Sequence, residues 1–242
     1  MVTFGRDDDL RRAEFLRADL SGARFVGSDL AGVVMRGVDV AGADIDSPWL
    51  FDDSFWVNGV DVAPLVDAAL DQRFPGRERR RAGDPDGLRA AWAALERTWA
   101  ATVARASADE VDVSVGGEWS FAQTLRHLVM ATDTWLGRAI LRLDEPYHPL
   151  GLPDAGAGRH GLDLALFTTD TPSYADVLAV RAERIGMVRD FLAGVTADEL
   201  AEPRRNPWDA EHEMPVRSCL HVILEEEWEH HRYAVRDLDA LG

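Results

Sequence analysis

The segment PVRSCLHVILEEEWEHHRYAVRDL, residues 215–238, contains the side chains best suited to metal chemistry. Read as a helix, it has an inward stripe with a spacing of three or four residues: Val216, Leu220, Ile223, Glu227, His231, Ala234 and Leu238. A carboxylate and an imidazole therefore interrupt an apolar stripe, one turn apart. Because an isolated buried carboxylate is costly and a divalent cation compensates it, we expect Glu227 and His231 to bind a metal.

The neighbouring residues Glu226 and His230 have the same Glu-x-x-x-His spacing. They share a helical face with Val222 and Tyr233, away from the inward stripe, so we predict that this pair is solvated. The alternative interpretation for a Glu and a His at this spacing is an ordinary hydrogen-bonded pair without any metal.

A third ligand must come from another helix, and His127 is the best candidate. It lies in the segment SFAQTLRHLVMATDTWLGRAIL, residues 120–141, which opens with a capping box between Ser120 and Gln123. Two His and one carboxylate make a site with an open position for water or substrate. This donor set fits Zn²⁺, and it also describes non-haem Fe(II) sites.

The segments EWSFAQTLRHLVMATDTWL and CLHVILEEEWEHHRYAVRDL resemble the second and fourth helices of the DinB-like metal-binding four-helix bundles. The resemblance covers residues 85–240. The usual ligands in that family are three His, one on the second helix and a His-x-x-x-His pair on the fourth. Glu227 departs from this pattern in a way that resembles the thiol-dependent branch, which includes mycothiol-dependent maleylpyruvate isomerase. The resemblance favours Zn²⁺ as the cofactor, with Ni²⁺ and Fe²⁺ as alternatives.

The same resemblance implies an enzyme, a metal-dependent thiol S-transferase that uses a low-molecular-weight thiol such as mycothiol. The metal would activate the thiol as a thiolate, which would attack an electrophile. Two other classes stay open. One is a hydrolase or a non-haem iron oxidase on the same triad. The other is a non-catalytic interaction module in which the metal is structural.

Residues 8–47 repeat with a period of five, which is neither the helix period nor the strand period. The central positions are apolar: Leu10, Phe15, Leu20, Phe25, Leu30, Met35, Val40 and Ile45. The pattern resembles pentapeptide repeats, which form a right-handed β-helix. Eight repeats would give about two coils, a stabilising or dimerising appendage with two ends to cover.

The remainder predicts four long amphipathic helices, which bury their apolar stripes most simply as one bundle. The first follows Asp84-Pro85, and the third opens at Ser173 and ends near Gly194. The long connection over 144–171 suggests a crossover, compatible with the up-down-down-up topology of the DinB-like family. We therefore expect a mainly α four-helix bundle with a small β-helix. The expected domains are residues 1–50 as repeats, 51–84 as a linker with a short helix, and 85–242 as the bundle.

Composition limits the partners. The net charge is −17 without any Lys, which disfavours nucleic acid and anionic membranes. The basic run RERRR, residues 77–81, is interpreted as a solvated linker. No apolar run is long enough to span a bilayer, no signal core is present, and the single Cys219 fits a reducing cytoplasm. The expected partners are a small-molecule thiol and an electrophile, with a homodimer as a further option.

No nucleotide-binding loop and no GxSxG, HExxH or CxxC motif occurs in the sequence. The chemistry is therefore expected at the metal. The long loops that follow the second and third helices should frame the mouth of the site. We expect its rim to be lined by Trp119, Tyr147, His148 and Trp208.

Overall fold

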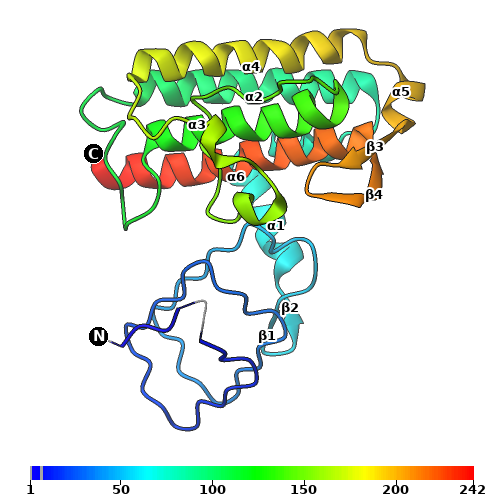
Figure 1. The fold of residues 1–242 in the computed structure, drawn as a ribbon. Helices are drawn as coiled ribbons and strands as arrows, with labels where there is room; N and C mark the ends of the chain where they lie inside the picture. The colour runs from blue at the N-terminus through cyan, green and yellow to red at the C-terminus, as the bar shows by residue number, and fades with distance from the viewer. Residues whose placement is uncertain (1, 6–7) are drawn as a thin grey trace. The chain divides into compact units, whose positions relative to one another are not determined.

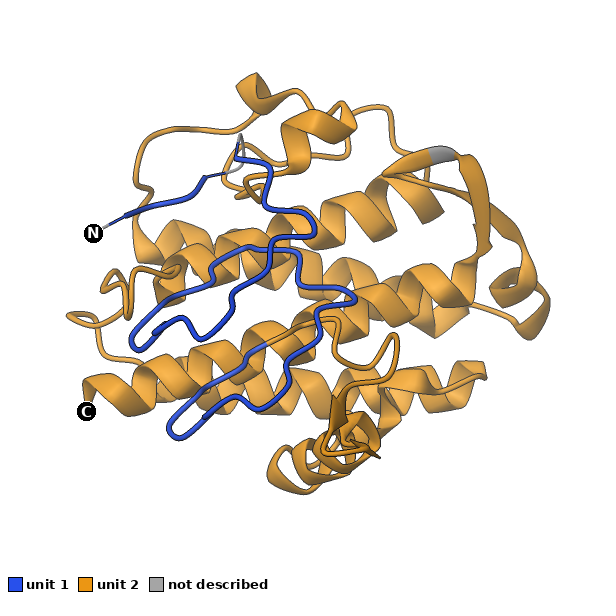
Figure 2. Ribbon diagram, turned by 90° about the horizontal axis from the view of Figure 1, so that it is seen from below, with its two compact units in different colours: residues 1–46 blue, residues 47–242 orange. Residues whose placement is uncertain are grey.

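A computed structural model describes residues 2–5 and 8–242. The chain divides into two compact units, Met1–Asp46 and Ser47–Gly242 (Figure 2). The first unit contains the repeats, and the second contains all the helices and strands found in the described residues.

The pentapeptide period of the first unit is expressed as regularly spaced turns. The amide of Ala13 donates to the carbonyl of Leu10 at 3.0 Å, and equivalent bonds recur at intervals of ten residues. Residues with positive φ recur every five: Arg12, Arg17, Gly22, Gly27, Gly32, Gly37 and Gly42. An Asp side chain accepts the amide two residues on, as Asp29 does from Ala31 at 2.9 Å. The regular spacing of five is thus a spacing of backbone turns stabilised by short polar side chains.

The strands that a β-helix implies are absent from the described residues of this unit. The eight central apolar side chains remain between 43% and 62% exposed. A solenoid buries its central side chains by stacking one coil on the next. Because eight repeats supply only about two coils, each with an open end, the central side chains stay partly exposed.

The second unit begins with a small hairpin and a short helix, continues with four long helices, and includes a second hairpin before the last of them. The elements are β1 Trp56–Val57, β2 Val60–Asp61, α1 Ala63–Arg73, η1 Arg77–Arg81, α2 Pro85–Arg105, α3 Phe121–Thr132, η2 Asp133–Ile140, η3 Ala157–His160, η4 Leu164–Leu166, α4 Tyr174–Gly194, α5 Ala197–Ala201, β3 Pro203–Asn206, β4 Asp209–Pro215 and α6 Val216–Leu241 (Figure 1). The predicted four-helix bundle is confirmed.

The predicted helix starts are confirmed by their caps. Asp84 accepts the amide of Gly87 at 2.9 Å at the start of α2. At the start of α3, Ser120 and Gln123 form a complete capping box, and Ser173 caps α4 in the same way as Asp84 caps α2. These side chains satisfy amides that a helix leaves without partners at its first turn, so the sequence alone marks where each helix begins.

The bundle has the up-down-down-up topology. The end of α2 lies beside the end of α6, where Arg105 donates to Asp239 at 2.8 Å. The starts of α3 and α4 lie together, with the rings of Phe121 and Tyr174 6.4 Å apart. Parallel neighbours need a long return connection, and the 141–173 loop provides it (Figure 1). Both α2 and α3 pack against α4 and α6, so α6 is flanked by two long helices.

One connection and one helix differ from the sequence-based expectation. The segment PRRNPWDAEHEMP, expected as a loop, forms the antiparallel hairpin of β3 and β4. The second long helix changes from α to π geometry at Asp133 and ends at Ile140. Neither feature has a period that distinguishes it in the sequence, because the strands are short and polar and the π-helix keeps an apolar inner face.

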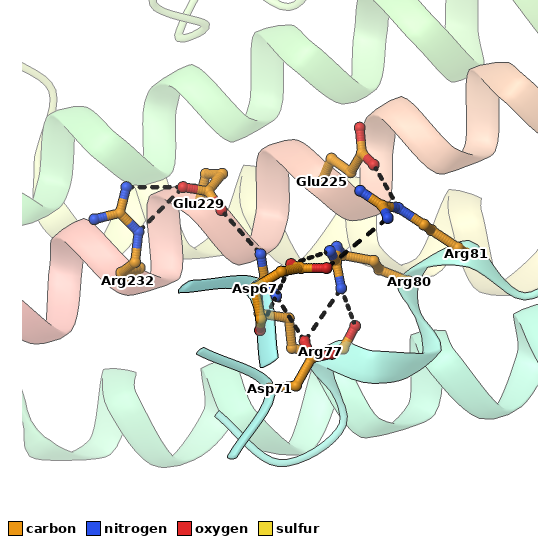
Figure 3. Close-up of polar contacts among 8 residues, drawn as sticks. All are labelled: Asp67, Asp71, Arg77, Arg80, Arg81, Glu225, Glu229 and Arg232. Carbon is orange, nitrogen blue, oxygen red and sulfur yellow. Dashed lines mark hydrogen bonds and ion pairs between the residues drawn. The ribbon is translucent and has the colours of Figure 1, made fainter. Parts of the chain in front are cut away.

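The RERRR segment is a 3₁₀ helix, η1, and packs on the bundle (Figure 3). Arg77 and Arg80 are only 2% and 4% exposed, so the prediction of a solvated linker is wrong for these two residues. The physical reason is a pair of carboxylates one turn apart on α1. Arg77 lies 2.6 Å from Asp71, and Arg80 lies 2.6 Å from Asp67. Arg77 also approaches Glu229 of α6 at 3.7 Å, so the network joins η1 to the last helix.

The main core is formed by the four long helices, with the aromatic side chains of Trp92, Trp99 and Trp228 buried within it. Within the part of the chain that the structure describes, no helix combines the length and the apolar content that crossing a membrane requires.

Candidate metal centre

Three consecutive glutamates of α6, residues 225–227, point toward three different elements. Successive residues of a helix are rotated by about 100° around its axis. All three side chains therefore find partners only if other elements surround most of the helix. The respective partners are Arg81 of η1, His127 of α3 and Arg181 of α4. The middle one, Glu226, forms the candidate centre.

His127 of α3 meets Glu226 and His230 of α6, which are one turn apart. The Nε2 atom of His127 lies 3.5 Å from Glu226 Oε2, and the Nε2 atom of His230 lies 3.3 Å from the same oxygen. One ligand atom from each of the three side chains lies within 4.8 Å of the others. Two imidazole nitrogens and a carboxylate oxygen thus converge on one small volume.

The tautomer of His127 follows from its second contact. Its Nδ1 atom lies 3.0 Å from the backbone carbonyl of Leu152, which can only accept a hydrogen bond. Nδ1 therefore carries the proton, and in the neutral ring Nε2 presents its lone pair toward Glu226. A metal-binding His is typically oriented in this way, by donating its other ring N–H to a carbonyl or carboxylate.

The electrostatics of the cluster favour an ionised Glu226. Burial alone would raise the pKa of Glu226, but its contacts with His127 and His230 outweigh burial and hold the pKa well below its usual range. Burial lowers the pKa of His230, with the Glu226 contact opposing it. An ionised carboxylate and neutral imidazoles are the ligand forms. Because His127 Nε2 and a carboxylate oxygen of Glu226 face each other at 3.5 Å, either a proton or a metal cation between them satisfies both atoms.

The cluster is accessible from one side. The Glu226 side chain is 34% exposed, whereas those of His127 and His230 are 8% and 14% exposed. The half-buried Trp119 ring forms one wall, 4.7 Å from the His127 ring and stacked on His230 at 6.0 Å. A small molecule can therefore approach along the carboxylate while the imidazoles stay largely shielded from water.

Glu227, expected as a metal ligand, lies elsewhere. The prediction that it is buried is correct, since it is 1% exposed. Its compensating cation is the guanidinium of Arg181 from α4, which donates to both carboxylate oxygens. Burial raises the pKa of Glu227, and the Arg181 charge acts in the opposite direction. The structure thus gives this carboxylate an ion-pair partner and does not bring it to His127.

His231, the other expected ligand on α6, is a core residue. Its Nε2–H donates to the Thr102 hydroxyl at 2.9 Å, since that hydroxyl in turn donates to the carbonyl of Thr98. Burial lowers its pKa to about 4, so the ring is neutral. Its aromatic neighbours, at centroid distances of 5.1 to 5.8 Å, are Phe74, Trp99 and Trp228. The structure does not bring His231 to His127.

Of the four predicted rim residues, the structure brings Trp119 to the cluster. Tyr147 and Trp208 pack against a smaller core formed by the long loop and α3, and Tyr147 lines a separate shallow hollow of about 500 Å³. His148 donates its backbone amide to Asp133 at 2.8 Å, on the η2 side of the helix.

Sequence reasoning missed Glu226 and His230 because it placed the ligands on the most apolar stripe. That stripe is indeed buried from Val216 to Leu238, but it faces the interior of the bundle. A substrate must reach a catalytic metal, so ligands belong at the edge of a buried stripe. The repeated Glu-x-x-x-His spacing, one residue earlier in the chain, was the available signal.

Comparison with known proteins agrees with this architecture. The DinB superfamily model matches residues 88–234, more than half of the chain, and pentapeptide repeats match in eight copies over residues 9–47. Comparisons with curated proteins and with solved structures gave no significant match. The first match covers α3 and α4 completely, most of α2 and α6, and the residues His127, Glu226 and His230. The chain therefore belongs to the DinB superfamily, with pentapeptide repeats preceding its helical domain.

Proposed function

We propose that this protein is a divalent-metal-dependent thiol S-transferase whose metal is held by His127, Glu226 and His230. The observation that carries the proposal is the convergence of these three side chains at a solvent-accessible edge, with the tautomer of His127 fixed by Leu152. Three protein ligands leave room for an exchangeable one, which distinguishes a catalytic site from a closed structural site.

The identity of the middle ligand supports thiol chemistry. The usual DinB-like triad has three His, and the thiol-dependent branch that this chain resembles has a Glu in the middle position. Here Glu226 occupies that position. Two nitrogens and one carboxylate oxygen favour Zn²⁺, with Ni²⁺ and Fe²⁺ as alternatives.

His127, Glu226 and His230 would hold the divalent cation, which would supply the positive charge that lowers the pKa of a small-molecule thiol. The protein residues have supporting roles. His127 is held in one tautomer by Leu152, and Trp119 covers the imidazoles from water. Glu226 is the exposed member of the cluster and borders the approach of the substrates.

The thiol must come from a small molecule. The chain has a single cysteine, Cys219, which is fully buried, and burial raises its pKa to about 11. Such a thiol is protonated and inaccessible at neutral pH. A low-molecular-weight thiol such as mycothiol, together with a small electrophile, therefore fits the site.

The test combines metal analysis with a thiol panel. The protein is purified without added metal, its metal content is measured, and conjugation of monobromobimane to mycothiol, bacillithiol and glutathione is followed above the uncatalysed rate. We expect about one divalent ion per chain and conjugation that chelation abolishes and metal restores. The His230→Gln variant should lose both properties.

The matched control is His221→Gln, which alters a histidine of the same helix that contacts the backbone carbonyl of Ala82 at 2.8 Å. It should retain metal and activity. Bound metal without conjugation of any thiol would disprove the transferase. Metal-dependent turnover of esters, or oxidation that requires Fe²⁺, would then identify the hydrolase or the oxidase. A bound metal without an exchangeable water would identify a structural site.

A further inference from the structure

The backbone segment 148–152 of the long loop lies against α3 and supplies the carbonyl that orients His127. We propose that Arg126 is a positioning residue for this centre: it holds the loop against α3 so that the Leu152 carbonyl fixes the His127 tautomer. The consequence for metal affinity rests on the proposed metal site, whereas the consequence for the tautomer does not.

Arg126 is 7% exposed and joins two parts of the loop. Its Nε–H donates to the carbonyl of Leu150 at 2.9 Å, and a terminal N–H donates to the carbonyl of Thr168 at 3.4 Å. Its own carbonyl accepts the amide of Leu152 at 3.1 Å. Arg126 therefore contacts the segment at Leu150 and Leu152 and the later part of the loop at Thr168, and it directly precedes His127 in the sequence.

A second anchor fixes the other end of the segment. The carboxylate of Asp133, which is fully buried, accepts the backbone amide of His148 at 2.8 Å. Arg184 of α4 donates to the same carboxylate at 2.7 Å and compensates its charge. Within the segment, His148 Nδ1 accepts the amide of Leu150 at 3.1 Å. The loop is thus bonded to α3 and η2 before it reaches the Leu152 carbonyl.

The fit of the loop on α3 is close at Gly151. A Cβ atom added there would lie 3.0 Å from the Phe167 ring, 3.2 Å from the His148 carbonyl and 3.2 Å from Met130 Cβ. Two of these neighbours, the backbone carbonyl and the helix Cβ, cannot move aside easily. A side chain at this position would therefore push the segment away from α3.

The proposal separates a positioning role from a purely structural one. A buried arginine with carbonyl partners stabilises the fold wherever it lies. Only if the arginine holds the Leu152 carbonyl in position does its replacement change which nitrogen of His127 carries the proton. If the carbonyl moves, either ring nitrogen can carry the proton. The tautomer with Nε2–H must lose that proton before Nε2 can bind the metal.

The experiment uses the full chain and the variant Arg126→Met, which keeps the length of the side chain. Two-bond ¹⁵N–¹H correlation spectra of metal-free protein report the tautomer of each histidine, and His127→Gln assigns the signal. We expect His127 to be the Nδ1–H tautomer in the wild type and a mixture, or the Nε2–H tautomer, in the variant. Zn²⁺ affinity, measured by competition with a chromophoric chelator, should fall about 10- to 100-fold.

The matched control is Arg89→Met. Arg89 also donates to a backbone carbonyl, that of Leu192 at 2.8 Å, but it joins α2 to α4. It should change neither the tautomer nor the affinity. Arg126→Lys, which can still donate to one carbonyl, should recover the Nδ1–H tautomer and most of the affinity.

A folded Arg126→Met protein with His127 as the Nδ1–H tautomer and unchanged affinity would overturn the proposal. If Arg126→Met does not fold, Gly151→Ala tests the same displacement, and an unaltered tautomer there would count against the role of the segment. The proposed transferase can fail independently, because the tautomer is read without metal or thiol. A wild type that binds no Zn²⁺ would contradict the metal site itself.

Discussion

Glu226 and Glu227 are adjacent in α6, and each stabilises its carboxylate in a different way. Glu227 is deeply buried and forms an ion pair with Arg181, which is 4% exposed. Glu226 is partly exposed and faces two imidazoles. A buried carboxylate requires compensation, but the requirement does not specify whether the compensating group is a metal or an arginine.

At the level of single residues, the structure brings His127 to the candidate centre as expected, but it places Glu226 and His230 there in the positions expected for Glu227 and His231. His127 lies on the inward stripe of its helix, so the period of that stripe predicts that its side chain points into the bundle. Glu227 and His231 lie on an equally inward stripe, and that stripe is buried as expected. The partners that decide their roles are Arg181 on α4, 46 residues from Glu227, and Thr102 on α2, 129 residues from His231. Such contacts have no local signal.

Removing one partner of the buried ion pair should be costly. Arg181→Leu leaves the Glu227 carboxylate without its cation, so the free energy of unfolding should fall by about 3–5 kcal/mol. The double variant Arg181→Leu/Glu227→Leu should recover most of this loss, because it removes both buried charges. Urea unfolding monitored by circular dichroism measures the difference. A double variant no more stable than the single one would contradict the ion-pair account.

At the scale of elements, periodicity and caps located all four long helices, because each of those signals lies within one turn of the chain. The hairpin of β3 and β4 was not predicted because its strands are short and polar. The packing of η1 was not predicted because it depends on partners in α1 and α6. The η1 network has a further consequence for α6 (Figure 3). Its contacts with Glu225 and Glu229, together with that of Arg181 with Glu227, lie on the two sides of the Glu226 face and fix the rotation of the helix.

The η1 network should make stability depend on acid pH. Burial opposes ionisation of Asp67, but its contacts with Arg77 and Arg80 outweigh burial and lower the pKa of the carboxyl. A lowered folded-state pKa adds stability above the usual value of about 4, and this stability is lost as the pH falls through the folded-state pKa. Asp67→Asn should therefore cost about 2 kcal/mol at pH 7 and progressively less below pH 4.

The measurement is urea unfolding of both proteins between pH 7 and pH 3. The control is Asp86→Asn, whose side chain is 93% exposed although it also pairs with an arginine. It should change the free energy of unfolding by less than about 1 kcal/mol. A difference between wild type and Asp67→Asn that stays constant with pH would show that ionisation of Asp67 is not the cause.

At the scale of the molecule, the repeats and the helical domain are separate compact units, one built from regularly spaced turns and the other from packed helices. The repeat period was evident in the sequence because each turn is local. The main core of the helical domain consists of residues between Phe74 and Leu238, all outside the repeats. The chemistry assigned to the candidate centre likewise uses residues of this unit alone.

The fragment 47–242 should therefore fold without the repeats. We expect its Zn²⁺ affinity to equal that of the full chain within about threefold, since every proposed ligand and supporting contact is retained. Its free energy of unfolding should change by less than about 1 kcal/mol. Chelator competition and urea unfolding of the purified fragment test this. A fragment that fails to fold, or binds Zn²⁺ much more weakly, would show that the repeats support the centre.

The proposed function requires that α6 presents Glu226 and His230, and not Glu227 and His231, to the metal. The most direct test compares Zn²⁺ binding by His230→Gln and His231→Gln, identical substitutions one residue apart, after circular dichroism has established that both fold. We predict that His230→Gln weakens binding by more than about 100-fold, while His231→Gln, which can still bond to Thr102, binds within about threefold of the wild type. Loss of binding in His231→Gln with wild-type affinity in His230→Gln would contradict the account.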